Sequence, residues 1–520
     1  MKKEPARQFN LVDEDWIPVA GEGKVNLKRI FTDPTLKALG GNPIEKIALT
    51  KLLLAIAQAA YTPKSDEDWR ELGAKGMAEK ALNYLEEKKD CFWLYGDKPF
   101  LQMPSINKAQ IQSFSAVLPD IATGNTTILI ESQVERTLKN DEKARLLVFL
   151  SGFALGGKKT DNSVVLTKGY SGKTNDKGKP ATAKPGPSIG FLGYLHSFLC
   201  GNSICENIWL NLATQQDIKN IGQFNKGVGI PPWERVPEGE NCPAAIELKS
   251  TLMGRLIPLC RFTLLSDNGM HYSEGIAYPS HKEGGFDLSI AVDFSKKNSK
   301  AIWVDPDKRP WRELTSLLSF FSSEGDAKFD CPQLRLSIYR ARKAVKQFSI
   351  WSGGLKVSSN AGEQFVSGSD DFVESEALLK AEWLGEIWFT KLKQEMEILQ
   401  EVSKNLYGST ISYFKHQKAD GKKQAEQSTH LFWQLSERRF QELIDSCGDT
   451  SGNETKAMRY FFIEYANQAY NTFCPRDTAR QIDAWAACRP KLSKFMPDLP
   501  KNITDHKKES VEQWEQMEMF

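Results

Sequence analysis

Residues 351–375 read WSGGLKVSSNAGEQFVSGSDDFVES, and they divide a part of the chain with mixed strand and helix patterning from a part whose patterning is mostly helical. Glycines in this stretch permit sharp reversals and a close approach of the backbone to a ligand. Asn360, Gln364 and several serines add short hydrogen-bonding groups. This composition is typical of a recognition loop. The structural alternative is an ordinary hairpin that leads into a helix beginning at Ser375.

The sequence after this stretch predicts helices. From Leu378 to Leu406 the apolar residues recur with a spacing of three and four, which predicts one long amphipathic helix ending at Gly408. We predict three further helices, over residues 428–447, from an Asn453 cap to Phe473, and over residues 477–495. Four helices with short connections are typical of a bundle. The predicted fold class is therefore α+β, with a large mixed α/β domain over residues 1–375 and a C-terminal four-helix bundle over residues 376–520.

Composition limits the possible classes of protein. A chain of 520 residues is long enough for two or three domains, and crowded apolar positions predict a buried helix over residues 43–61. The formal net charge is only +2, so any binding to nucleic acid depends on local basic patches. Nine scattered cysteines without a Cys-x-x-Cys pair favour reduced thiols over disulfides or a zinc site. No long apolar run is present, so we expect an untargeted cytoplasmic protein without a membrane partner.

Residues 143–190 are basic and rich in glycine, with nine Lys or Arg, two Asp and eight Gly. The backbone of such a segment can lie against phosphates, and we favour binding to a nucleic-acid backbone over a merely solvated loop. Residues 167–174 are one residue short of a P-loop. However, Thr167 stands where the motif requires its first glycine, and the proline-containing sequence that follows cannot form the helix that would hold a phosphate. The sequence therefore argues against a nucleotide site here.

Residues 119–127 form a polar segment with little hydrophobic periodicity, and we expect a loop that can hold a partner. Three of its residues are suited to phosphate or 2′-hydroxyl contacts, namely Asn125, Thr126 and Thr127. A plain Asx or Ser/Thr turn explains the same residues equally well.

Two histidines, His271 and His281, lie near acidic residues but lack a fixed metal-binding spacing. We interpret them as structural or surface histidines. The sequence contains no carboxylate cluster and no complete P-loop either. We therefore predict no metal, no cofactor and no catalytic residue.

The opening Asn10-Leu-Val-Asp-Glu-Asp-Trp-Ile-Pro-Val19 resembles the N-terminal signature of the CasA family, the large subunit of the type I-E CRISPR surveillance complex Cascade. The resemblance continues through residues 98–102, 123–126 and 353–364 into the helical C-terminal part. It implies a non-catalytic antiviral subunit that binds the 5′ handle of the crRNA and recognises the protospacer-adjacent motif in double-stranded DNA. The same resemblance implies that the subunit starts R-loop formation and offers a docking platform for a helicase-nuclease.

The resemblance also implies site residues. The family's glycine loop, which contacts the minor groove, corresponds to Gly169, Tyr170, Ser171 and Gly172, with Lys173 adjacent. Its duplex wedge is an adjacent Asn–Gln pair, which here corresponds to Asn360 and Gln364 with Ala361, Gly362 and Glu363 between them. Because the two amides are separated in this chain, which of them enters the base stack is left open.

Two further sites follow from the same resemblance. The loop that binds the crRNA handle corresponds to Thr123, Gly124, Asn125, Thr126 and Thr127, with Ile128 where the family has an aromatic residue. A lysine that contacts the motif corresponds to Arg261 or to Lys282, and the sequence does not decide between them. Most cations of the predicted bundle fit a solvated face, but four are candidates for a basic face that contacts DNA or helps to recruit the nuclease, namely Lys391, Lys393, Arg438 and Arg439.

The implied partners are double-stranded DNA, the crRNA handle, the helicase-nuclease, and the backbone, small and handle-end subunits of Cascade. Two other classes of protein remain as alternatives. One is a nucleotide-dependent or metal-dependent enzyme that uses Gly172-Lys173-Thr174 or the two histidines. The other is a scaffold whose basic loop binds only RNA.

Overall fold

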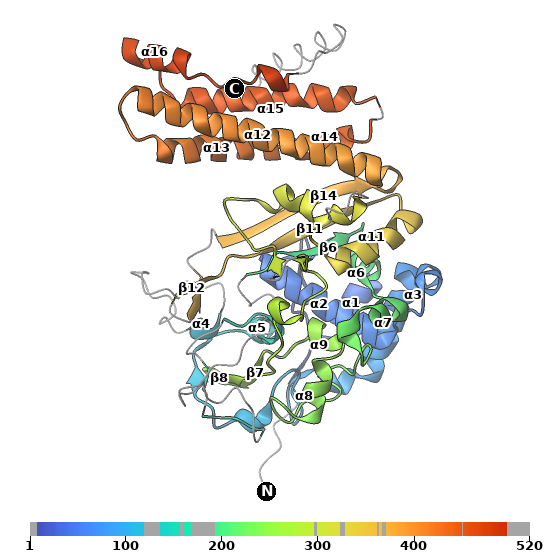
Figure 1. The fold of residues 1–520 in the computed structure, drawn as a ribbon. Helices are drawn as coiled ribbons and strands as arrows, with labels where there is room; N and C mark the ends of the chain where they lie inside the picture. The colour runs from blue at the N-terminus through green and yellow to red at the C-terminus, as the bar shows by residue number, and fades with distance from the viewer. Residues whose placement is uncertain are drawn as a thin grey trace. The chain divides into compact units, whose positions relative to one another are not determined.

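The computed structural model describes residues 8–118, 136–155, 160–161, 163–167, 193–295, 299–322, 328–360, 363–366, 371–449 and 451–496. The chain divides into two compact units. The mixed unit comprises Met1–Phe320 with Ala327–Ala377, and the helical unit comprises Phe321–Asp326 with Leu378–Phe520. Helices and small sheets alternate along the first unit, whereas helices dominate the second (Figure 1). The prediction of a chain that mixes helix and sheet is confirmed.

The helices of the mixed unit vary from one turn to more than five turns. They are α1 (Leu27–Thr32), α2 (Pro43–Ala60), α3 (Asp66–Glu87), α4 (Phe114–Val117), α5 (Asn140–Gly152), α6 (Ile204–Asn211), α7 (Gln215–Asn220), α8 (Pro243–Leu248), α9 (Met253–Leu256), α10 (Leu314–Leu317) and α11 (Pro332–Ala344). The predicted buried helix is α2, whose residues are buried on nearly every side. It begins with a capping box, because Asn42 Oδ1 accepts the N–H of Glu45 at 2.9 Å and the Glu45 carboxylate accepts the N–H of Asn42 at 3.1 Å.

The core of this unit is pinned by a pair of tryptophans from different helices. Trp69 of α3 and Trp209 of α6 stack with ring centroids 4.2 Å apart and ring planes 6° from parallel. Each indole N–H donates to the backbone carbonyl of the other tryptophan, at 2.8 and 2.9 Å. Because both rings are buried and both polar atoms are satisfied, the pair fixes α6 against α3.

The strands are short and form small sheets. They are β1 (Gln8–Asn10), β2 (Ile17–Val19), β3 (Gly23–Val25), β4 (Trp93–Tyr95), β5 (Ile111–Gln112), β6 (His196–Cys200), β7 (Arg261–Ser266), β8 (Gly269–Glu274), β9 (Val292–Asp293), β10 (Lys300–Ala301), β11 (Gln347–Leu355), β12 (Ser358–Asn360), β13 (Glu363–Phe365) and β14 (Phe372–Lys380). Two sheets have three strands, in the orders β5-β8-β7 and β14-β11-β6. The pairs β1-β4, β2-β3, β9-β10 and β12-β13 complete the set among the described residues.

The sheet β14-β11-β6 carries the stretch that divides the chain. Strand β11 is central and antiparallel to β6, with Trp351 opposite Phe198. The indole N–H of Trp351 donates to the Glu374 carboxylate at 3.0 Å, and Lys46 of α2 binds the same carboxylate at 2.7 Å. Strand β11 therefore offers a fixed base to hairpin β12–β13, which begins three residues after β11 ends.

The expectation of a helix beginning at Ser375 is wrong, because Ser375 lies inside β14 and the next α-helix begins at Glu386. Val373, Ala377 and Leu379 are buried at alternating positions, which is the burial pattern of a strand. Apolar residues 378, 379 and 383 also fit a helical spacing, so the two periods overlap in this short segment.

The helical unit has three long and two short α-helices among its described residues. They are α12 (Glu386–His416), α13 (Lys422–Glu437), α14 (Phe440–Ser446), α15 (Asn453–Phe473) and α16 (Ala479–Ala487). Helices α12, α13 and α15 contact one another, α14 packs on α15, and α16 packs on α12. The predicted helix that ends at Phe473 is α15, but its N-cap is Gly452, and Asn453, the predicted cap, is its first helical residue.

Several predicted helix boundaries in this unit are wrong. Helix α12 continues through Gly408, because Thr410 and Tyr413 extend its buried face beyond the glycine. The helix predicted over residues 428–447 is divided in the structure, because α13 begins earlier, at Lys422, and is separated from α14 by Arg438 and Arg439. Helix α16 ends at Ala487, shortly before a proline, and a 3₁₀ turn follows over Ser493–Phe495. None of the described helices combines the length and apolar character needed to cross a membrane.

Candidate nucleic-acid interface

Hairpin β12–β13 contains the amides assigned to the duplex wedge. Ser358 pairs with Phe365, Ser359 with Gln364, and Asn360 with Glu363. Asn360 therefore belongs to the pair next to the two-residue connection, and Gln364 belongs to the neighbouring pair. Successive pairs of an antiparallel ribbon lie on alternate faces, so positions 360 and 364 belong to opposite faces of the hairpin. Ala361 and Gly362 lie outside the described residues.

The base of the hairpin is held by close backbone packing. A Cβ atom on Gly354 would lie 2.8 Å from the carbonyl oxygen of Tyr194 and 2.6 Å from a methyl group of Val304. On the other side, the N–H of Lys356 donates to the carbonyl oxygen of Asp371 at 2.8 Å. The glycine therefore permits a close approach of backbone to backbone, where the sequence indicated an approach to a ligand.

The two other predicted loops are not covered by the described residues. The glycine loop, from Gly169 to Lys173, and the handle loop, from Thr123 to Thr127, both lie outside them. The same holds for the Gly172-Lys173-Thr174 motif of the enzyme alternative. These assignments stay predictions.

The structure separates the two candidates for the motif-contacting cation. Arg261 is only 1% exposed, and its guanidinium donates to the carbonyl oxygens of Cys260 at 2.8 Å and Leu155 at 3.2 Å. Lys282 is exposed on a 3₁₀ turn over His281–Glu283. Arg261 is thus an internal structural residue, and Lys282 is the candidate that solvent and ligands can reach.

The 3₁₀ turn of Lys282 is tied to the segment around Tyr194. The hydroxyl group of Tyr194 lies 2.7 Å from Nδ1 of His281, and Ser299 donates to the carbonyl oxygen of His281 at 2.9 Å. Tyr194 also stacks on Trp303, with ring centroids 4.6 Å apart. Burial, aided by the charge of Lys282, lowers the pKa of His281, so the ring is neutral at neutral pH.

Both histidines of the enzyme alternative have partners within the protein. Nδ1 of His271 lies 2.7 Å from the carbonyl oxygen of Ala109, so this nitrogen is the protonated one. His281 is bound to Tyr194 as described. Across the part of the chain that the structure describes, no group of three His, Cys, Asp or Glu residues is arranged to hold a metal ion.

The four bundle cations differ in their surroundings. Lys391 donates to the carbonyl oxygen of Asp449. Arg439 donates to the hydroxyl group of Tyr465 at 3.0 Å and to the Glu442 carboxylate at 2.6 Å, and its guanidinium stacks over a phenylalanine ring at 4.0 Å. Lys393 is half-buried and Arg438 is exposed. Two of the four therefore serve contacts inside the helical unit.

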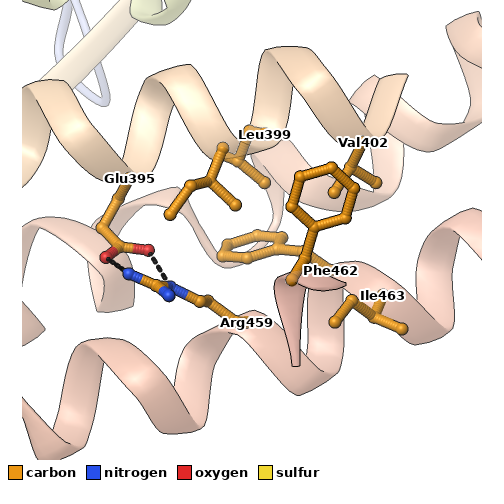
Figure 2. Close-up of a pocket in the computed structure, with 8 residues that line it drawn as sticks. Glu395, Leu399, Val402, Arg459, Phe462 and Ile463 are labelled. Carbon is orange, nitrogen blue, oxygen red and sulfur yellow. Dashed lines mark hydrogen bonds and ion pairs between the residues drawn. The ribbon is translucent and has the colours of Figure 1, made fainter. Parts of the chain in front are cut away.

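One polar pair in the helical unit was not predicted. Glu395 of α12 and Arg459 of α15 form two parallel hydrogen bonds, of 2.8 and 2.6 Å, beside a small apolar pocket (Figure 2). Leu399, Val402, Phe462 and Ile463 line this pocket, which has no room for a water molecule. The signal in the sequence was an acidic residue on the apolar face of α12, between Leu392 and Leu399. The pair fixes the register of α12 against α15 and is not a ligand site.

Solved structures define the class of this fold. A CasA (Cse1) structure from Thermus thermophilus aligns with a TM-score of 0.70 at 18% identity, covering 94% of this chain and 99% of that one. Cse1 from Thermobifida fusca aligns with a TM-score of 0.69 at 16% identity, covering 95% and 99%. A chain of a structure described as a CRISPR RNA-guided surveillance complex aligns with a TM-score of 0.66 at 13% identity, covering 95% and 100%. The mixed fold is therefore that of a class of CRISPR-associated proteins.

Sequence comparison identifies the family within this class. The sequence profile of the CRISPR-associated protein Cse1 family matches residues 10–471. The chain belongs to the Cse1 family, as the resemblance of its motifs predicts. The CRISPR-associated protein CasA/Cse1 of Thermus thermophilus is 31% identical over 164 residues, which are 29% of this chain. This match spans about a third (32%) of the length of the Thermus protein.

Proposed function

We propose that this chain is the DNA-reading subunit of a cytoplasmic crRNA-guided surveillance complex. In this role it recognises the protospacer-adjacent motif through the minor groove, opens the duplex to start R-loop formation and provides a docking platform for a helicase-nuclease. Membership of the Cse1 family supports the proposal. The observation that carries it is hairpin β12–β13, in which Asn360 belongs to the pair next to the two-residue connection and Gln364 to the neighbouring pair, above a base held by backbone hydrogen bonds.

The chemistry of a minor-groove reader agrees with the glycine-rich segment. The minor groove presents a degenerate pattern of donors and acceptors, so backbone amides and small side chains are sufficient to read a short motif. Base pairing between the guide and the target strand supplies the sequence specificity, so the protein has only to nucleate strand separation. Gly169 to Lys173 are the residues that we assign to this contact.

The wedge has to offset the cost of unstacking. Separating a base step costs a few kcal/mol, which an inserted side chain can offset by filling the gap and binding the exposed base edges. For a side chain to insert in this way, the protein backbone that supports the hairpin has to be held in place. The contacts of Gly354 and Lys356 hold the backbone in place where the hairpin starts.

Basic residues complete the proposed DNA path. We assign Lys282 to the motif-proximal DNA backbone because it is exposed on a turn that His281 fixes to Tyr194. We propose that the helical unit forms a bundle that contacts DNA or the nuclease. Of the four cations assigned to its basic face, Lys393 and Arg438 are the two that we assign to this contact. Thr123 to Thr127 are assigned to the crRNA handle, and the other Cascade subunits are the expected protein partners.

Co-purification with neighbouring subunits and crRNA, followed by binding to a library of motifs, tests the proposal. We expect motif preference in the assembled complex. Gly172→Asp should weaken that preference without disturbing assembly, because a Cβ atom and a negative charge keep the backbone from the phosphates. Lys173→Ala should mainly lower salt-dependent affinity. Equal binding of all motifs by the wild-type complex would favour the RNA-binding scaffold, and nucleotide hydrolysis or metal-dependent cleavage by the pure chain would favour the enzyme.

A further inference from the structure

We call residues 168–192, which contain the assigned glycine loop, the loop segment, and the chain just before this segment is held by a buried carboxylate. The N–H groups of Leu166 and Thr167 donate to the two oxygens of Glu240, at 2.8 and 2.9 Å. The N–H of Asn241 donates to the hydroxyl oxygen of Thr167 at 3.2 Å. A Cβ atom on Gly239 would lie 2.3 Å from the same oxygen. Residues 239–241 therefore hold Leu166 and Thr167, which are the last described residues before residue 168.

A carboxylate is well suited to this clamp. Glu240 is 0% exposed, and a buried carboxylate is costly unless donors surround it. Each bond to a backbone N–H is charge-assisted and stronger than a neutral hydrogen bond. A glutamine at this position has the same shape but only one acceptor oxygen, so its NH₂ group would face one of the two N–H donors.

The chain just after the loop segment is held by the hairpin base. Gly193 has a φ of +69°, and a Cβ atom on it would lie 2.4 Å from the carbonyl oxygen of Leu355 and 2.9 Å from the backbone nitrogen of Val357. The carbonyl oxygen of Gly193 accepts the N–H of Val304 at 2.9 Å. Leu355 ends β11 and Ser358 begins β12, so Gly193 crosses the chain at the point where the hairpin starts.

We infer that Glu240 and Gly193 are positioning residues that fix the chain on the two sides of the loop segment, with Gly193 joining it directly to the base of hairpin β12–β13. Neither residue is expected to touch DNA. The inference rests on the proposed function, in which the segment contacts the motif and the hairpin separates the strands. The two anchors would fix the distance between these two contacts. A change at either anchor should therefore lower motif discrimination without removing general DNA affinity.

Gly193 can be tested against a glycine with the same backbone conformation. Gly227 has a φ of +74°, and a Cβ atom on it would meet nothing within 4 Å. Both alanine variants carry the strain of a positive φ, but only Gly193→Ala displaces the hairpin base. In the assembled complex we expect Gly193→Ala to lower the ratio of R-loop rates on motif and scrambled-motif targets about tenfold, and Gly227→Ala to keep it within about twofold. Equal ratios in the two variants would overturn the inference.

Glu240 can be tested against another buried carboxylate. Asp217 is 8% exposed, accepts the N–H of Thr214 at 2.9 Å and binds Arg340. We expect Glu240→Gln to lower motif discrimination about tenfold and Asp217→Asn to leave it unchanged at a similar loss of melting temperature. Glu240→Asp keeps the charge and should restore part of the discrimination. A similar loss in Glu240→Gln and Asp217→Asn would mean that stability alone is affected, and would overturn the inference.

Hydrogen exchange separates failure of this inference from failure of the proposed function. The amides of Leu166 and Thr167 should exchange faster in Glu240→Gln than in wild type and Asp217→Asn, whatever the DNA does. Unchanged exchange at these amides would overturn the anchoring role even if the wild-type complex reads the motif. If the wild-type complex shows no motif preference, the proposed function fails, and faster exchange would still support anchoring by Glu240.

Discussion

The carboxylate of Asp449 accepts the backbone N–H of Glu454 at 3.1 Å, across the turn that begins α15. It also accepts the N–H and the hydroxyl group of Ser451, at 2.9 and 2.7 Å. These bonds, led by that of the Ser451 hydroxyl, lower the pKa of Asp449 to about 2. The N–H groups of a first helical turn lack partners within the helix, so Asp449 acts as a cap for α15.

The lowered pKa predicts how the stability of the helical unit depends on pH. Because the pKa of Asp449 is lower in the folded than in the unfolded protein, its stabilisation is complete above the unfolded value near pH 4 and is lost as the pH falls towards 2. We expect Asp449→Asn to lower the denaturant midpoint of the helical signal near neutral pH, with a difference from wild type that shrinks below about pH 4. Circular dichroism of the full chain measures both. A difference that stays constant down to pH 2 would exclude the capping role.

Lys282 and Arg261 should respond oppositely to substitution. We expect Lys282→Ala to leave the melting temperature unchanged and to weaken binding of motif-bearing duplex about tenfold, with a salt slope lower by about one. Arg261→Met should instead cost about 2 kcal/mol of stability, because the buried carbonyl oxygen of Cys260 and the part-buried one of Leu155 lose their donor. Filter binding at several salt concentrations and thermal unfolding make the comparison. Wild-type affinity in Lys282→Ala would remove this lysine from the DNA path.

The bundle cations can be tested in two pairs. Lys393 and Arg438 can be reversed to Glu with little structural cost, and we expect the double variant to read the motif but to retain R-loops about tenfold more briefly at low salt. Lys391→Met with Arg439→Met serves as the control, because these side chains bind within the helical unit and their loss should lower the melting temperature. Unchanged target degradation after the charge reversal would count against the helical unit as a DNA or nuclease contact.

Periodicity predicted the long elements well. Helices α2 and α15 stand where crowded or regularly spaced apolar residues placed them, since a long pattern averages out single exceptions. Gly408 did not end α12, because buried residues on the next turn outweigh the modest cost of one glycine in a helix. The sequence predicts helix from Ser375 onward because the apolar residues 378, 379 and 383 also fit a helical spacing, and only pairing of β14 with β11 decides for a strand.

Only those parts of the candidate site that depend on neighbouring residues in the sequence could be predicted. The hairpin strands follow from alternation and a glycine-containing connection, but the pairing of Asn360 with Glu363 depends on register. The burial of Arg261 depends on Leu155, 106 residues away in sequence, and the contact of Glu240 with Thr167 spans 73 residues. Contacts of this kind arise from tertiary packing and leave no pattern in one sequence.

The register of hairpin β12–β13 distinguishes the two amides that we assign to strand separation. Because Asn360 belongs to the pair next to the connection, we expect Asn360→Ala to slow strand opening more than Gln364→Ala. The double variant should fold, assemble and bind the crRNA handle as wild type does. Removing both amides leaves the cost of unstacking without an offset, so R-loop formation on a fully paired target should slow about a hundredfold, which corresponds to roughly 3 kcal/mol.

The most direct test compares the rate of R-loop formation by Asn360→Ala/Gln364→Ala on a fully paired target and on a target with a pre-melted bubble beside the motif. In the bubbled target the bases are already unstacked. We therefore expect a large defect on the paired target and a rate close to wild type on the bubbled one. An equal defect on both targets would mean that the hairpin contributes affinity alone, and would contradict its role in strand separation.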